Sequence, residues 1–209
     1  MISKSILKSI IYFPIAIPGI LCYLLTNKDA KSKIEMDVAA YWKRTRGKLN
    51  NPVTFSHWYS LYTSNREFRN VYYCRLGLMG KILPVFLKPL SSLFINPTLC
   101  KNYDGGLYIA HGTSTQIYAN KIGKNLWMHH NVTIGMIGEG RPVIGENVYI
   151  GTGAVILGGI TIGNNVRIGA NAIVVDDVPD NAVVVSPKAK VVKILTPQNG
   201  KTQMGGVTC

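Results

Sequence analysis

Residues 144–174 read IGENVYIGTGAVILGGITIGNNVRIGANAIV, in which an aliphatic residue returns at every sixth position. The same register reaches back to residue 122 across a slip of four residues, and its members are Ile122, Met128, Ile134, Ile144, Ile150, Ile156, Ile162, Ile168 and Val174. A period of six fits neither the 3.6-residue repeat of a helix nor the alternation of a plain strand. It predicts a solenoid in which three short strands form a triangular coil of about 18 residues and stacked coils bury the aliphatic ladder.

A second apolar position lies four residues after the ladder position and holds Val132, Val148, Ala154, Ile160, Val166 and Ala172. Glycine and asparagine fill the predicted corners, because both tolerate the positive φ angles of sharp turns. A degenerate first coil can be traced through Tyr103, Ile109 and Thr115, which gives about four coils. We expect the ladder to end at residues 176–179, with a hydrophobic strand following at residues 182–185.

The composition changes along the chain and predicts four regions. Residues 1–34 form a hydrophobic and basic segment, 35–95 a helical region, 96–195 the β-helix domain and 196–209 a flexible tail. Within the helical region we expect helices at 33–46 and 64–79, with breaks at Asn50-Asn51-Pro52 and at Pro84.

The uncharged stretch from Ile10 to Leu25 would reach only about 24 Å as a helix, short of the roughly 30 Å hydrocarbon thickness of a bilayer. Pro14 and Pro18 are expected to interrupt it further. Lysines flank it on both sides, so it resembles an interfacial anchor for an acidic membrane surface more than a true span. A helix packed inside the protein or an oligomer is an equal alternative.

Charge is unusual, with 23 Lys and Arg against 10 Asp and Glu, a formal net charge of +13. Such a balance favours anionic partners. The basic residues crowd the first hundred positions while the repeat carries few, which argues against a nucleic-acid groove along the solenoid.

The four cysteines, Cys22, Cys74, Cys100 and Cys209, are scattered without disulfide-like spacing. We therefore expect reduced thiols and a cytoplasmic protein. Its N-terminal segment is a candidate for peripheral attachment to the inner face of the cytoplasmic membrane.

Two histidines occupy equivalent positions in successive coils. His111 follows the ladder residue Ile109 by two positions, and His130 follows Met128 by two. Their side chains should therefore lie on the same face of adjacent coils, about one strand spacing (~4.8 Å) apart, whereas His129 should point the other way. The four-residue slip creates a loop at residues 136–141, which we expect to project close to the histidines.

At these residues the chain resembles the hexapeptide-repeat acyltransferases, in particular the serine acetyltransferase-like branch. The matching segments are GLYIAHGT at 106–113, VTIG at 132–135, PVIG at 142–145, IGTGA at 150–154 and IGANA at 168–172, within about residues 94–193. The resemblance implies a mainly β fold, a left-handed parallel β-helix with an α-helical N-terminal segment. It also implies a homotrimer with active sites between protomers, acetyl-CoA as the donor and no metal.

The resemblance places His111 at the position of the catalytic base, with His130 in a supporting role. Imidazole suits this role because it titrates near working pH and a hydroxyl becomes a good nucleophile only as it loses its proton. Asn131 and Arg141 are the candidates for contact with the acceptor. The family implies cofactor contacts at Gly135, Met136, Thr152, Arg167 and Ala170. We add Lys188 and Lys190 as candidates for binding the phosphates of CoA. Solvated tail lysines are the alternative for the last two.

Three departures from the serine enzymes bear on the acceptor. Ala110 stands where their motif has an Asp before the catalytic histidine, Arg141-Pro142 lacks the histidine of their Arg-His-Pro, and the upstream Asp that pairs with the catalytic histidine is absent near positions 94–96. Those polar groups help to bind serine. A sugar hydroxyl of a surface polysaccharide (capsule, exopolysaccharide or O-antigen) is therefore the expected acceptor, and serine O-acetylation is the alternative.

Two further hypotheses belong to other classes of protein. Stacked histidines bind zinc in carbonic-anhydrase-like members of the same fold, but zinc needs at least three protein ligands, and His57 lies in the helical region. A non-catalytic scaffold of a polysaccharide-synthesis complex is the other, and the presence of His111 in the family motif counts against it.

Overall fold

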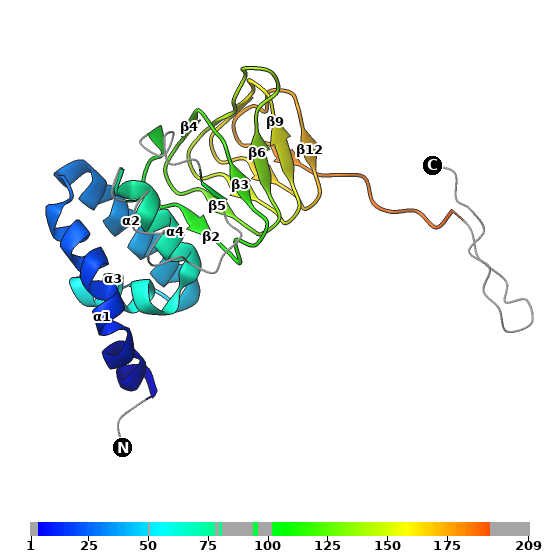
Figure 1. Cartoon of the computed structure of the whole chain (residues 1–209). Coiled ribbons are helices and arrows are strands. Elements are labelled where there is room, and N and C mark those ends of the chain that lie inside the picture. Colours follow the sequence, from blue (N-terminus) through cyan, green and yellow to red (C-terminus); the bar gives the residue numbers. More distant parts are fainter. Residues whose placement is uncertain (1–3, 50, 78–79, 81–93, 96–101, 193–209) are drawn as a thin grey trace, which may run out of the picture.

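The computed structural model describes residues 4–49, 51–77, 80, 94–95 and 102–192. In this part of the chain, four helices pack together at one end of a triangular parallel β-helix (Figure 1). The helices are α1 (Lys4–Leu25), α2 (Lys28–Thr45), α3 (Phe55–Ser64) and α4 (Arg66–Arg75). Both predicted helices in the helical region are present, although α2 begins earlier than predicted and α4 is preceded by the separate helix α3. The prediction that the second helix continues to Met79 is wrong, because α4 ends at Arg75 and Gly77, two residues later, has a positive φ of 58°. Pro84 lies outside the described residues.

Helix α1 runs through Pro14 and Pro18, so the expectation that these prolines interrupt it is wrong. Tertiary packing supports the helix: Ala16 is buried, and a Cβ on Gly19 would lie 2.6 Å from the Tyr62 hydroxyl oxygen. The Tyr72 hydroxyl donates a hydrogen bond of 2.7 Å to the Gly19 carbonyl. The opposite face exposes an apolar stripe at helical spacing, namely Phe13, Ile17, Leu21 and Leu24. Among the described residues, no helix combines the length and apolarity needed to cross a bilayer.

In the described ranges, thirteen short strands form three parallel sheets, one for each side of the triangle. Sheet A contains β1 (Phe94–Ile95), β3 (Gln116–Ile117), β6 (Thr133–Gly135), β9 (Val155–Leu157) and β12 (Ile173–Val174). Sheet B contains β4 (Lys121–Ile122), β7 (Val143–Ile144) and β10 (Thr161–Ile162). Sheet C contains β2 (Tyr108–Ile109), β5 (Trp127–Met128), β8 (Tyr149–Ile150), β11 (Arg167–Ile168) and β13 (Val183–Val184).

The pairing register confirms the predicted ladder. Ile122 pairs with Ile144 across the slip, and Ile144 pairs with Ile162 one coil later. All nine predicted ladder side chains are buried. The second apolar positions, including Val132 and Val166, are buried as well, so each coil contributes two apolar positions per side to a continuous core.

The register differs from the prediction at both ends of the ladder. In the first coil Ile117, not Thr115, pairs with Ile134, because the preceding corner holds two more residues than the later corners. At the other end the ladder continues past residue 176: Val178 bridges to Ile162, and the predicted final strand is present as β13, paired with β11.

Helix α2 covers the open edge of sheet C. The backbone of Ile109, in the edge strand β2, donates to the Tyr41 hydroxyl (3.3 Å) and accepts from it (3.4 Å). The Leu107 amide donates to a carboxylate oxygen of Asp37 (2.8 Å). Backbone groups that would otherwise be buried without partners are thereby satisfied, so the helical part closes the first coil.

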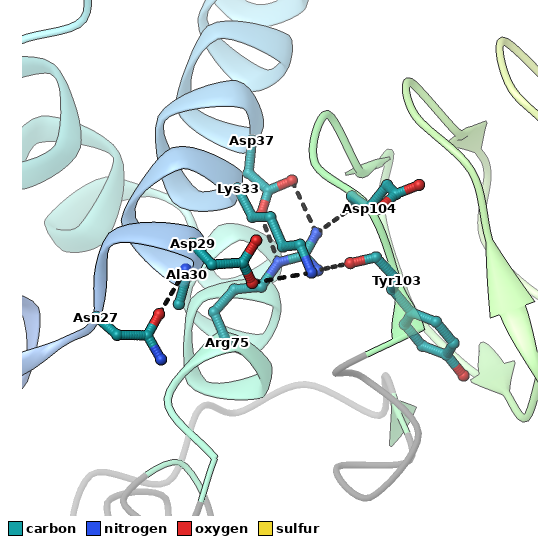
Figure 2. A network of polar contacts seen from close by, with 8 residues as sticks. All are labelled: Asn27, Asp29, Ala30, Lys33, Asp37, Arg75, Tyr103 and Asp104. Atoms are coloured by element: carbon teal, nitrogen blue, oxygen red, sulfur yellow. Dashed lines mark hydrogen bonds and ion pairs between the residues drawn. The ribbon is translucent and has the colours of Figure 1, made fainter.

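A buried ion pair joins α2, α4 and the first coil (Figure 2). Arg75 Nε lies 2.9 Å from Asp37 Oδ2, and the same guanidinium donates to the carbonyl oxygens of Tyr103 and Asp104. Burial raises the pKa of the Asp37 carboxyl, while Arg75 and the Leu107 amide act in the opposite direction. The Arg75 guanidinium thus makes four hydrogen bonds, two to the Asp37 carboxylate and two to backbone carbonyls, which fix the angle between α2 and the β-helix.

The expectation that all cysteines are reduced is wrong for Cys74, which is disulfide-bonded. Cys22 is free, so the partner of Cys74 lies outside the described residues. Spacing along a chain does not report distance in the fold, which is why scattered cysteines gave no signal for this bond.

Candidate active site

The chain turns from sheet C to sheet A at a corner that repeats in every coil. We call the residues His111, His130, Thr152 and Ala170 at this turn the histidine corner. Backbone hydrogen bonds stack the successive turns: Asn131 N–H to Thr113 O (2.9 Å), Gly153 N–H to His130 O (3.2 Å) and Asn171 N–H to Thr152 O (2.9 Å). The β-helix therefore holds these side chains in one column.

The two histidines meet as the register predicted. Pairing of Ile109 with Met128 brings His111 opposite His130, and their ring centroids lie 6.4 Å apart with the planes 74° from parallel. The ring separation exceeds one strand spacing because the rings meet edge to face. Two imidazoles thus face one another at the surface of the first two described turns.

His111 has a left-handed backbone, with φ 55°. It begins the lengthened corner of the first coil, where Ser114 also has positive φ and the Thr113 amide donates to the His111 carbonyl. Such a backbone costs about 1 kcal/mol or more for a residue with a Cβ, and it aims the exposed His111 side chain away from the ladder. Side-chain direction at this position is therefore fixed by a turn that the six-residue period does not predict.

His130 and His129 have different surroundings. His130 is half-buried, and its Nδ1 is buried with no hydrogen-bond partner among the described residues. His129 lies on sheet C, with its ring 5.8 Å from that of Trp127 and 5.6 Å from that of Tyr149. Burial lowers the pKa of His129, and the neighbouring His130 and His111 add to this effect. The His129 ring thus contacts aromatic rings of sheet C, whereas the rings of His111 and His130 contact each other at the corner.

The slip residues form a hairpin in which Ile137 and Gly140 exchange backbone hydrogen bonds of 3.2 and 3.1 Å. The expectation that this loop lies close to the histidines is wrong within one chain. Strand β6 separates His130 from Met136, and six extended residues span up to about 20 Å. The loop therefore projects from the turn between sheets A and B, at the far end of sheet A from the histidine corner.

The acceptor candidates are likewise separated. Asn131 lies at the corner turn, with φ 57°. Arg141 lies beside the first coil instead: burial raises the pKa of Tyr103 to about 12, and the charge of Arg141 opposes that rise. Arg141 Nε is buried without a hydrogen-bond partner in the described part of the chain.

The cofactor candidates fall into three places. Thr152 and Ala170 lie at the histidine corner, and the Ser186 hydroxyl donates to the Ala170 carbonyl (3.1 Å), so Lys188 and Lys190 follow directly after a contact with that corner. Gly135 and Met136 lie at the other end of sheet A, at the base of the loop. Arg167 lies on sheet C, with its guanidinium 5.0 Å from the Tyr149 ring centroid.

A groove that sequence reasoning missed lies between α2 and sheet C, with a volume of about 420 Å³. We call it the arginine groove, after its charged and aromatic lining residues Lys43, Arg44, Trp127, Tyr149 and Arg167. Trp127, Tyr149 and Arg167 each precede a ladder residue, so the register could have placed them on one face. Only the tertiary structure brings Lys43 and Arg44 of α2 against them. Among the described residues, no three His, Cys, Asp or Glu side chains form a group suited to a metal ion.

The bacterial transferase hexapeptide family (six repeats) matches residues 141–176. A protein of Escherichia coli K12 named for colanic acid biosynthesis, the acetyltransferase WcaB, is 46% identical over 87 residues, which are 40% of this chain and 54% of the relative. Serine acetyltransferase of Helicobacter pylori is 39% identical over 92 residues, 42% of this chain and 54% of that protein. The chain thus spans about half the length of these relatives.

A crystal structure of Neisseria gonorrhoeae serine acetyltransferase in complex with serine is similar with a TM-score of 0.59 and 27% identity. The match covers 81% of this chain and 71% of that one. The left-handed parallel β-helix with helices before it, predicted from the sequence, matches this fold.

Proposed function

Because this chain belongs to the hexapeptide-repeat transferases, we propose that it is an O-acetyltransferase, moving acetyl from acetyl-CoA to a sugar hydroxyl of a surface polysaccharide. The observation that carries the proposal is the pair His111 and His130, presented edge to face at a corner of the β-helix. The similarity to enzymes named as acetyltransferases supports the same chemistry.

In the proposed mechanism, His111 takes the proton of the acceptor hydroxyl as its oxygen attacks the thioester carbonyl carbon. The carbon–sulfur bond then breaks, and the imidazolium returns the proton to the leaving sulfur, so the acetyl ester and free CoA are formed without an acyl-enzyme. His130 supports the reaction from the next coil. Its buried and unpaired Nδ1 is suited to a hydrogen bond with a reactant or with a water held beside His111.

The pantetheine end of acetyl-CoA would lie along the histidine corner past Thr152 and Ala170. Lys188 and Lys190 are exposed and follow the contact of Ser186 with Ala170, so their ammonium groups are available for the phosphates. Gly135 and Met136 would act on the site of a neighbouring protomer, since β6 carries them away from their own histidines.

A trimer is therefore part of the proposal. In it, the loop of residues 136–141 from one protomer would cover the histidine corner of the next. Met136 and Ile137 expose 42% and 58% of their surface in the single chain, which suits a segment that packs on a neighbour.

A sugar is favoured over serine as the acceptor for two reasons. Ala110, buried beside His111, offers no carboxylate for an ammonium group. Arg141, the one cation of the loop motif, lies near Tyr103 in its own chain, and the motif lacks the histidine that follows it in the serine enzymes. The similarity to WcaB points to the same substrate class.

Thiol release from acetyl-CoA tests the proposal. The protein should release CoA with an acidic or neutral exopolysaccharide oligosaccharide as acceptor, and the product ester should appear in the mass spectrum of the glycan. Robust turnover with L-serine and none with glycans would replace the sugar by serine as the substrate.

The apolar stripe of α1 supports seating on an acidic membrane surface, where lipid-linked glycans are found. Lys28 and Lys31 follow the stripe in the chain and can meet anionic headgroups. Flotation with phosphatidylglycerol vesicles should carry the protein upward, and Ile17→Ser with Leu21→Ser should abolish this. Unchanged flotation of that double variant would rule out the stripe as the membrane contact.

A further inference from the structure

The arginine groove is built from two parts of the chain that are far apart in sequence. Lys43 and Arg44 come from the last turns of α2, while Trp127, Tyr149 and Arg167 stand in a row on successive strands of sheet C. The Asp37–Arg75 pair and the Tyr41 hydroxyl fix α2 to the first coil, so the two walls are held in a constant relation.

Positive charge in the groove is uncompensated. Three cations line it, no carboxylate does, and none of the three forms an ion pair with any residue in the described ranges. Arg44 is half-buried, and this burial lowers the pKa of its guanidinium. Clustered positive charges repel one another, and partial burial removes some of the water that would screen them. An anionic ligand lowers the electrostatic free energy of such a surface.

The arginines are also oriented by aromatic rings. The Arg44 guanidinium carbon lies 4.8 Å from the Trp127 ring centroid and 5.1 Å from that of Tyr108, and the Arg167 guanidinium carbon lies 5.0 Å from that of Tyr149. A guanidinium held against an aromatic ring keeps N–H donors on its edge, and these donors can bind a carboxylate with two hydrogen bonds. Trp127 Nε1 is buried and has no hydrogen-bond partner among the residues described, so it is an additional donor that a ligand acceptor could satisfy.

The groove leads to the histidine corner along sheet C. The His129 ring contacts those of both Trp127 and Tyr149, and His130 follows it at the corner. From Trp127 to His130 the strand advances about 10 Å, a length that a short oligosaccharide covers. Partly exposed aromatic side chains such as Trp127 and Tyr149 suit contact with the C–H groups of sugars, and arginine edges suit their carboxylates.

We propose that the arginine groove binds an acidic sugar residue of the acceptor glycan, holding its carboxylate on Arg44 and Arg167 while a neighbouring sugar presents its hydroxyl to His111. This inference rests on the proposed function and specifies its substrate class as a uronate-containing glycan. Arg167, expected from the family resemblance to contact CoA, is thereby assigned to the acceptor.

Binding without turnover tests the inference. Calorimetry on the whole protein would compare a tetrasaccharide alternating glucuronic acid and N-acetylglucosamine with the neutral tetrasaccharide of N-acetylglucosamine. The acidic probe should bind at least about tenfold more tightly, and Arg44→Gln or Arg167→Gln should each weaken it by about tenfold, because a charge-assisted hydrogen-bonded pair is lost. The neutral probe should be unaffected by either variant.

Arg46→Gln is the matched control: it removes the same charge near the end of α2, but Arg46 is bound to Ser60 and Ser64 outside the groove. An equal loss in this variant, or equal binding of both probes, would overturn the inference.

Two other outcomes would assign the groove to a different ligand. Arginine variants that raise KM for acetyl-CoA without changing glycan affinity would assign the groove to the CoA phosphates. Competition by phosphatidylglycerol vesicles alone would assign the groove to lipid. Tight binding of the acidic probe with no acetyl transfer to any glycan would instead refute the proposed function and leave the groove assignment standing.

Discussion

His111 combines an exposed imidazole with a left-handed backbone, and the two properties can be separated by substitution. Asn tolerates positive φ better than Ala does, yet neither can act as a base near neutral pH. We expect His111→Asn and His111→Ala to lose activity by roughly 10²- to 10⁴-fold, with only the Ala variant losing about 1 kcal/mol of stability. Acetyl transfer and urea unfolding check this. Full turnover by the Asn variant would show that another group is the base.

His130 should matter less than His111, because it acts from the next coil through its position beside the base. His130→Ala is expected to reduce kcat by about tenfold while leaving KM for acetyl-CoA near the parent value. His57→Ala, in the helical part, serves as the control and should leave kcat near the parent value. If His130→Ala turns over normally while His111→Ala does not, the supporting role is wrong.

His129 predicts a pH dependence of stability. Its pKa is lowered by burial and by His130 and His111, so above about pH 6.5 it is neutral in both the folded and unfolded chain and contributes nothing. As the pH falls below that value, the unfolded chain takes up a proton that the folded chain resists, and the free energy of unfolding decreases. His129→Phe keeps the ring contacts and should lose less stability between about pH 7.5 and 5.5, measured by urea unfolding.

At the level of elements, α2 depends on the Asp37–Arg75 pair, whose two side chains are almost fully buried. Asp37→Asn leaves a buried guanidinium without its counter-charge and should lower stability by about 3–5 kcal/mol. Asp29→Asn is the control, because the Asp29 side chain in the Lys33 ion pair is 77% exposed and its loss should cost less than about 1 kcal/mol. Equal unfolding midpoints for the two variants would contradict the anchoring role.

The strands of the β-helix were predictable because each ladder position is defined by its neighbours in sequence. The ladder position of Ile117 in place of Thr115 was not predictable, since the first corner is two residues longer and no six-residue period marks that insertion. The unbroken α1 was missed for a different reason. A proline removes one backbone hydrogen bond from a helix, but here the packing of α1 on Tyr62 and Tyr72 offsets that loss and keeps the helix continuous.

For the whole molecule, the distance between the loop and the histidines of one chain predicts sites shared between protomers. A His111→Ala chain and a chain lacking residues 136–141 should each be inactive alone. Coexpressed and assembled at random, they should regain about one quarter of the parent activity, because some corners then pair an intact histidine with an intact neighbouring loop. Activity assays on the copurified mixed oligomer check this. No regain, despite mixed trimers in native mass spectrometry, would place the whole site within one protomer.

The sequence by itself determined the β-helix, its ladder and the meeting of His111 with His130, since a strict six-residue period fixes which side chains stack from coil to coil. The tertiary structure alone decided where α2 lies, where the loop projects and how Arg44 comes to face Trp127 and Tyr149. The position of α2 depends on a buried ion pair and on a hydroxyl at a strand edge, which join residues 38 and 68 positions apart. No local period encodes such contacts.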